Sequence, residues 1–126
     1  MSSHVHMIIS SRNEKPDNII RDIKRHTAGQ LRRAISENPQ ESRKEWMLWL
    51  MKRAGIKNKN NNDFQFWQQH NKPIELTNNK LINQKLDYIH NNPVRAGIVS
   101  NPEDYIYSSA RDYSGQKGLL DIVLIE

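Results

Sequence analysis

The sequence predicts an α+β domain, and two observations support this prediction. Short segments in which apolar residues alternate with polar ones, or which are rich in aromatic residues, are typical of β-strands; they lie at residues 4–10 and 64–70. Longer segments with apolar residues at helical spacing predict helices at residues 17–35, 40–54 and 78–91. A chain of 126 residues has the length of a single domain with a modest core.

The composition limits the class of protein and of partner. The formal net charge is +5, which suits a polyanionic partner such as a nucleic acid. The chain has no cysteine, so disulfides and thiolate metal sites are excluded. No apolar run approaches the roughly 18–20 residues of a membrane span, and the N-terminus lacks the pattern of a secretory signal. We therefore expect a cytoplasmic protein without a membrane partner.

The first predicted strand, residues 4–10, carries two histidines. Residues two apart point to the same side of a strand, so His4 and His6 project together while Val5, Met7 and Ile9 face the core. Two interpretations fit this pattern: half-buried histidines of an ordinary strand, or a pair of metal ligands. The motif around Tyr88, described below, favours the pair of ligands.

The predicted helix at 17–35 has an apolar stripe and a strongly basic remainder. Pro16 suits its first turn, and Asp17 or Asn18 is the expected cap. The apolar stripe predicts packing on a sheet. The basic residues are either a solvated face or contacts to DNA phosphates, which supply affinity rather than sequence choice. These basic residues are Lys24, Arg25, Arg32 and Arg33.

The predicted helix at 40–54 contains Trp46 and Trp49, which we interpret as core or interface residues in preference to base-stacking platforms. Gly55 is the expected helix stop. A polar, asparagine-rich loop at 57–63 follows, and then the aromatic strand at 64–70.

The last predicted helix, 78–91, carries Tyr88 and has Thr77 as its expected N-cap. Pro93 is expected to prevent a regular helix beyond it. Tyr88 and Asn92 are four residues apart, so a last helical turn places them on one face. Arg95 follows as a candidate for holding phosphate through its guanidinium fork, with a structural ion pair as the alternative.

Together these residues describe a phosphodiester-breaking site. Two imidazoles and an amide oxygen can hold a divalent cation with coordination positions left open, and such a cation polarises a phosphoryl oxygen. A tyrosine can then attack as a covalent nucleophile. Tyr88 can also be an ordinary packed tyrosine, and Tyr105, Tyr107 and Tyr113 are alternatives by residue type.

Two motifs resemble those of a known family. His4-Val5-His6 followed by Met7-Ile8-Ile9, with Tyr88-Ile89-His90-Asn91-Asn92-Pro93-Val94-Arg95-Ala96-Gly97 later in the chain, resembles the single-tyrosine transposases of the HUH superfamily. The closest branch is the REP-associated tyrosine transposases. The resemblance covers about residues 1–113, and residues 114–126 form a C-terminal extension whose apolar part, 119–125, suits an edge strand or a partner contact.

The resemblance implies a fold and an activity. The fold is a ferredoxin-like or RRM-like antiparallel sheet with helices on one face. The activity is cleavage and rejoining of single-stranded, hairpin-forming DNA through a 5′-phosphotyrosine on Tyr88, with Mg or Mn held by His4, His6 and Asn92. In the family a strand, a helix and another strand precede the histidine pair, so we expect this domain to be N-terminally incomplete and to favour a homodimer.

Three functions remain open from the sequence. The first is the DNA transposase, with Tyr88 serving its own histidine pair or that of a partner. The second is a catalytically inactive DNA-binding remnant of such a transposase. The third, ranked last because the aromatic signature of RRM domains is missing, is an RNA-binding sheet domain.

Overall fold

The computed structural model describes residues 4–61 and 63–125, and the chain divides into two compact units. One unit joins the segment ending at Ile9 to the chain from Ile74 onward, and the other is Ser10–Pro73. Residues 1–3, 62 and 126 lie outside the described residues, and so does the expectation about what precedes His4.

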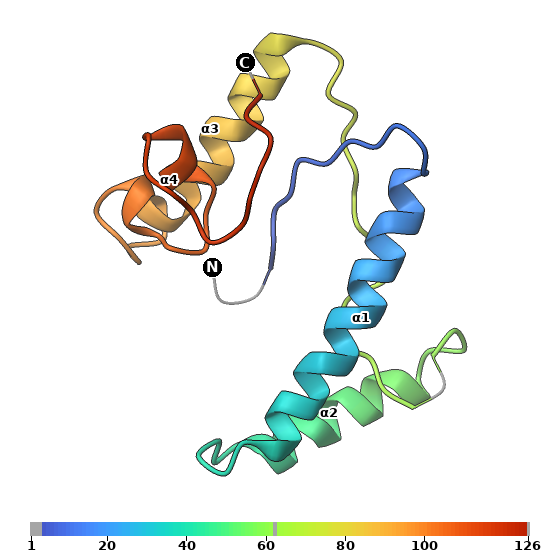
Figure 1. Ribbon diagram of the computed structural model, residues 1–126. Coiled ribbons are helices and arrows are strands. Elements are labelled where there is room, and N and C mark those ends of the chain that lie inside the picture. The colour runs from blue at the N-terminus through green and yellow to red at the C-terminus, as the bar shows by residue number, and fades with distance from the viewer. Residues whose placement is uncertain (1–3, 62, 126) are drawn as a thin grey trace. The chain divides into compact units, whose positions relative to one another are not determined.

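The described residues form helices joined by long irregular segments (Figure 1). The unit Ser10–Pro73 contains α1 (Pro16–Glu37) and α2 (Lys44–Ile56). The other unit contains α3 (Asn79–Arg95), the short 3₁₀ helix η1 (Pro102–Asp104) and α4 (Ala110–Tyr113). None of the helices described by the structure is both long and apolar enough to cross a membrane.

The predicted α+β fold, with its ferredoxin-like or RRM-like antiparallel sheet, is wrong. The described residues contain no β-strand, and the segments 4–10, 64–70 and 119–125 form no β-bridge with one another or with the described remainder. A strand is stable only as part of a hydrogen-bonded ladder, and here no second strand completes one. Val5, expected in the core, is consequently 64% exposed.

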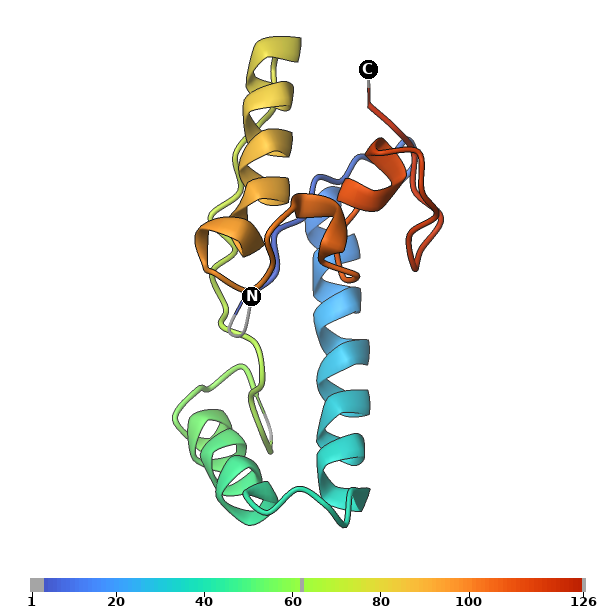
Figure 2. The same cartoon turned by 90° about the vertical axis from the view of Figure 1, so that its left-hand side faces the viewer.

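The helical hairpin of α1 and α2 forms the frame of its unit (Figures 1 and 2). Pro16 occupies the first turn of α1, as predicted, because its missing N–H would have no helical partner there. The predicted caps Asp17 and Asn18 are wrong, since both lie inside the helix and Lys15 stands at the cap position. No residue of α1 is buried, so its apolar stripe is only partly covered.

The aromatic segment after α2 packs on this hairpin instead of forming a strand. Trp67 donates its Nε1–H to Thr27 Oγ1 of α1, at 2.8 Å. The guanidinium of Arg32 lies over the Phe64 ring, 4.6 Å from its centre. Aromatic residues bury their rings equally well on helices and on sheets, which is why the composition of this segment did not decide its structure.

Gly55 does not stop α2, contrary to the prediction, because the helix continues to Ile56. Its role is to let another segment approach: a Cβ at this position would lie 2.5 Å from the Cα of Phe64. The crossing is secured by the Gln65 N–H, which donates to the Met51 carbonyl at 2.9 Å. Met51 and Gly55 are the buried residues of α2.

The unit that contains α3, η1 and α4 is built around His90 of α3. His90 and Ala110 are buried, with 9% and 4% of their surface exposed. The His90 Nε2 lies 2.9 Å from Ser109 Oγ, and its ring lies 5.1 Å from the ring of Tyr113. The segment around Tyr107–Tyr113 therefore packs back on the helix that carries Tyr88.

Candidate functional site

The helix α3 presents Tyr88 to solvent. It begins with Asn78, whose side chain accepts the Leu81 N–H at 2.9 Å, so the cap is Asn78 and not the predicted Thr77. Apolar Ile82, Leu86 and Ile89 are partly covered, whereas the Tyr88 side chain is 44% exposed. The helix therefore holds Tyr88 on its accessible side, where a large substrate can reach the phenol.

The C-terminal turn of α3 places Asn92 one turn after Tyr88. The helix continues through Pro93 to Arg95, beyond the predicted end, because the proline removes only one N–H from the last turn. Gly97, with φ of 69°, closes the end: its N–H donates to Val94 O at 2.9 Å, and the Ile98 N–H donates to Pro93 O at 3.0 Å. This is the Schellman pattern, so the Pro-to-Gly part of the motif is a helix cap.

The side chain of Asn92 has an unmet polar group. Its Nδ2 is buried and has no hydrogen-bond partner among the described residues. A buried polar atom without a partner costs about 1–3 kcal/mol. Rotating the amide by 180° exchanges its nitrogen and oxygen with little change in shape, so the buried position can equally hold an acceptor. One amide position of Asn92 is therefore left unsatisfied by the described residues.

The two histidines lie at the start of the same unit as Tyr88, and the structure brings one of them to it. The rings of His6 and Tyr88 meet edge to face with centroids 5.4 Å apart. The rings of His4 and His6 meet in the same manner at 4.9 Å. Three of the four predicted site residues thus form a continuous chain of ring contacts, and the fourth, Asn92, is one helical turn from Tyr88.

The surroundings of His6 favour its neutral imidazole. Partial burial lowers the pKa of His6 below its ordinary value, and the neighbouring His4 lowers it further. An imidazole must be neutral to bind a metal ion. The described residues contain no cluster of three or more His, Cys, Asp or Glu side chains that could hold a metal ion. The side chains of His4, His6 and Asn92 are of the ligand types that a divalent cation with open positions accepts.

The predicted phosphate-binding residues are placed on two helices. Lys24 of α1 donates to the Gln68 carbonyl, and Arg32 covers Phe64, so both also hold the aromatic segment in place. Arg25 and Arg33 are exposed on α1. Arg95 is exposed in the last turn of α3, and the ion pairs within the described chain involve other residues. Arg25, Arg33 and Arg95 are therefore available to an anion, whereas Arg32, although exposed, also covers Phe64.

Two features were missed by the sequence interpretation. Of the expected core or interface role of the tryptophans, the core alternative is wrong, because Trp46 and Trp49 are 58% and 51% exposed on α2, and the interface alternative stays a prediction. The signal was their spacing of three residues followed by Arg53 four residues later, which places all three on one helix face. The second feature is the bond between His90 and Ser109, which joins residues far apart in sequence and leaves no local pattern.

Comparisons with protein family models, with curated proteins and with solved structures gave no match for this chain.

Proposed function

We propose that this protein is a DNA transposase of the single-tyrosine type: a metal-dependent endonuclease and strand transferase acting on single-stranded, hairpin-forming DNA. The observation that carries the proposal is the edge-to-face contact of His6 with Tyr88, at 5.4 Å between ring centroids. It joins the two motifs whose resemblance suggested the family, and it puts a nucleophile beside a metal-ligand candidate.

In the proposed reaction the Tyr88 phenol oxygen attacks the scissile phosphorus. A P–O bond to Tyr88 forms while the bond to the 3′ oxygen breaks, and the phenol proton lost is matched by one gained on the 3′-hydroxyl. The product is a 5′-phosphotyrosine, which a 3′-hydroxyl can attack in reverse to rejoin strands. The exchange of one phosphodiester for another conserves bond energy, so no cofactor has to supply it.

His4, His6 and Asn92 are the residues that would hold Mg or Mn. When bound, the ion polarises the phosphoryl oxygen and stabilises the charge that develops on it. A phenol is a weak nucleophile while it keeps its proton, so attack by Tyr88 needs this nearby positive charge. Arg95, exposed on the same helix as Tyr88, is suited to hold a neighbouring phosphate.

A second candidate function is DNA binding without cleavage. The exposure of His4 and His6, on a segment that forms no ladder within the described chain, favours it. A catalytic constellation needs rigid support, whereas phosphate contacts by Arg25 and Arg33 do not. A homodimer is a further proposal: Val5, Leu120 and Val123, exposed by 64%, 75% and 88%, suit a contact with a second copy.

The decisive experiment is a covalent-adduct assay. The protein is mixed with labelled single-stranded hairpin DNA and Mn²⁺, and a slowly migrating species is sought on a denaturing gel. We expect an adduct that is lost in Tyr88→Phe and in His6→Ala. Tyr107→Phe and His70→Ala, both at exposed positions, are the matched controls and should retain it.

The outcomes separate the two candidates. An adduct that survives Tyr88→Phe assigns the nucleophile to another tyrosine and refutes the proposed site. Bound DNA without any adduct, in the presence of Mn²⁺, supports the non-catalytic function. Sedimentation in the same buffer tests the dimer, and a monomer at all concentrations contradicts it.

A further inference from the structure

The helix α2 has two apolar faces, and the described residues of its unit cover only one of them. Met51 and Gly55 are buried, and Met47, Leu48 and Ala54 are partly covered on the same side. The opposite side is an exposed stripe at spacings of three and four residues, which we call the tryptophan stripe. It consists of Trp46, Trp49, Leu50, Arg53, Ile56 and Lys57.

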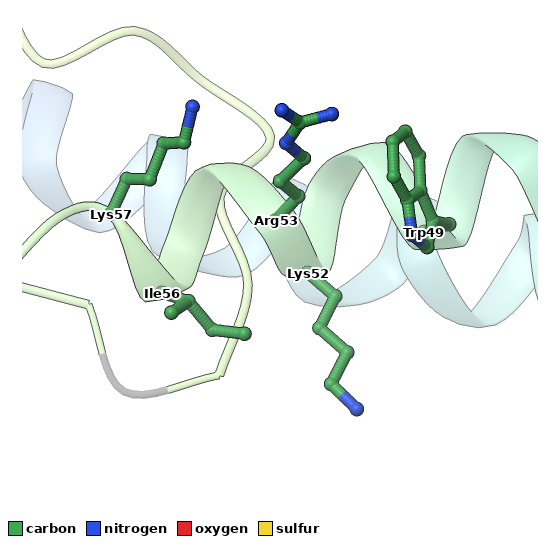
Figure 3. A pocket seen from close by; sticks show the side chains of 5 residues that line it. All are labelled: Trp49, Lys52, Arg53, Ile56 and Lys57. Atoms are coloured by element: carbon green, nitrogen blue, oxygen red, sulfur yellow. The ribbon is translucent and has the colours of Figure 1, made fainter.

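The tryptophan stripe combines large rings with positive charge. The guanidinium of Arg53 lies over the Trp49 ring, 5.0 Å from its centre. Figure 3 shows Trp49, Arg53 and Lys57 projecting to one side of the helix, with Lys52 leaving on the other. These side chains and Ile56 line a shallow pocket of about 350 Å³. The stripe runs for about 17 Å along the helix, at 1.5 Å per residue.

The chemistry of the stripe selects its occupant. Exposed aromatic rings beside a cationic track are what proteins use to bind single-stranded nucleic acid, because bases stack on the rings while Lys and Arg meet the phosphates. A guanidinium over an aromatic ring adds a cation–π contribution to such a site. Glu45 is the only acidic residue of α2, against Lys44, Lys52 and Arg53, so the helix attracts a polyanion.

We propose that the tryptophan stripe of α2 is a stacking platform for single-stranded DNA. Bases lie on Trp46 and Trp49, and Arg53 and Lys57 contact the intervening phosphates. The site uses neither Tyr88 nor a metal ion, and it belongs to the unit that lacks them. The choice of DNA as the strand rests on the proposed function, whereas the stacking itself rests on the geometry of α2.

The test is binding of fluorescent oligothymidylate to the whole protein with EDTA present, so that cleavage does not contribute. Trp46→Ala and Trp49→Ala should each raise the dissociation constant by about fivefold or more, which corresponds to the lower end of the energy range for base stacking on an aromatic ring. Arg53→Gln should reduce the slope of log affinity against log salt by about 0.7, the value for one phosphate on a single strand.

Each control variant replaces a side chain of the same kind, at an exposed position outside the tryptophan stripe. Tyr107→Ala removes an aromatic ring that is 74% exposed, and Lys117→Gln removes an exposed charge. Both should leave the dissociation constant within twofold of the parent. Circular dichroism of each variant verifies that the helices remain, and quenching of tryptophan fluorescence by the oligonucleotide should fall when both tryptophans are replaced.

Several results would overturn the proposal. Equal affinity of parent and tryptophan variants would show that the strand binds elsewhere. A parent that does not bind oligothymidylate would refute the site altogether. Stronger binding of oligouridylate would replace DNA with RNA as the occupant. The tryptophan variants could instead lose vesicle binding, or a dimer in sedimentation, while they keep oligonucleotide binding. That result would assign the stripe to a membrane or protein contact. An absent adduct with intact stacking would refute only the catalytic proposal.

Discussion

The ring of His6 meets the ring of Tyr88 edge to face, with centroids 5.4 Å apart, and His4 lies against His6 at 4.9 Å. If these imidazoles bind Mn²⁺, removing one of them should lower the affinity for Mn²⁺ more than a change outside the site does. We expect His6→Ala to raise the Mn²⁺ dissociation constant at least tenfold, since even changes behind the ligands cost 10–100-fold in metal sites. Electron paramagnetic resonance of free Mn²⁺ measures it, with His26→Ala on α1 as the control. Equal affinity in both variants would remove His6 from the site.

The bond between His90 and Ser109 should stabilise the unit that carries Tyr88. Ser109→Ala leaves the buried His90 Nε2 without its partner at 2.9 Å, so we expect a loss of about 1–3 kcal/mol in the free energy of unfolding. Urea denaturation followed by circular dichroism measures this loss. Ser100→Ala, at an exposed position, should change the free energy by less than about 0.5 kcal/mol. Identical midpoints for both variants would mean that the bond contributes nothing.

His90 should also make this unit less stable in acid. Burial lowers its pKa below the ordinary value of 6.5, and the carboxylate of Asp87 offsets this only in part. Below pH 6.5 the histidine of the unfolded chain therefore binds a proton, whereas folded His90 resists it. The contribution of neutral His90 to the free energy of unfolding is complete above pH 6.5 and is lost as the pH falls through the lowered pKa. Urea midpoints at pH 7.5 and 5.5 should differ less in His90→Gln than in the parent. An unchanged difference would exclude His90 as the cause.

Two glycines of the helical hairpin should respond in opposite directions to the same substitution. Gly55→Ala places a Cβ 2.5 Å from the Phe64 Cα, so the crossing must move, at a cost of about 1–3 kcal/mol. Gly29→Ala, inside α1 with nothing within 4 Å of the new Cβ, should stabilise by about 0.5–1 kcal/mol because alanine loses less entropy in a helix. Thermal unfolding of the two variants measures the difference. A stabilising Gly55→Ala would show that the Phe64 segment does not cross there.

The sequence located the helices because their signals are local. The spacing of apolar residues predicted 17–35 and 78–91, and the structure has Pro16–Glu37 and Asn79–Arg95. The errors fall at the ends, where Asn78 and Gly97 decide the boundaries through hydrogen bonds of their own backbone and side chains. The face shared by Tyr88 and Asn92 was predictable for the same reason, because it follows from helical periodicity alone.

The prediction of β-strands was wrong because the pairing of strands does not depend on local sequence. The alternation in residues 4–10 describes a segment able to join a ladder, and it contains no information about whether a second strand is present. The contact between His6 and Tyr88 is likewise long-range, so the two motifs suggested it only through the family resemblance. A core or interface role for Trp46 and Trp49 was predicted from their residue type, yet their exposure depends on which face of α2 the rest of the unit covers.

The amino-acid sequence by itself determined the helical segments, the basic charge and the identities of the candidate ligands and nucleophile, since all of these depend on residues near one another in the chain. The tertiary structure alone decided that the alternating segments form no ladder with the described residues, that Gly55 is a point of close approach and not a helix stop, and that one apolar face of α2 is exposed. The physical reason is that ladder pairing and burial depend on partners distant in sequence, whereas helix formation is satisfied by hydrogen bonds within four residues.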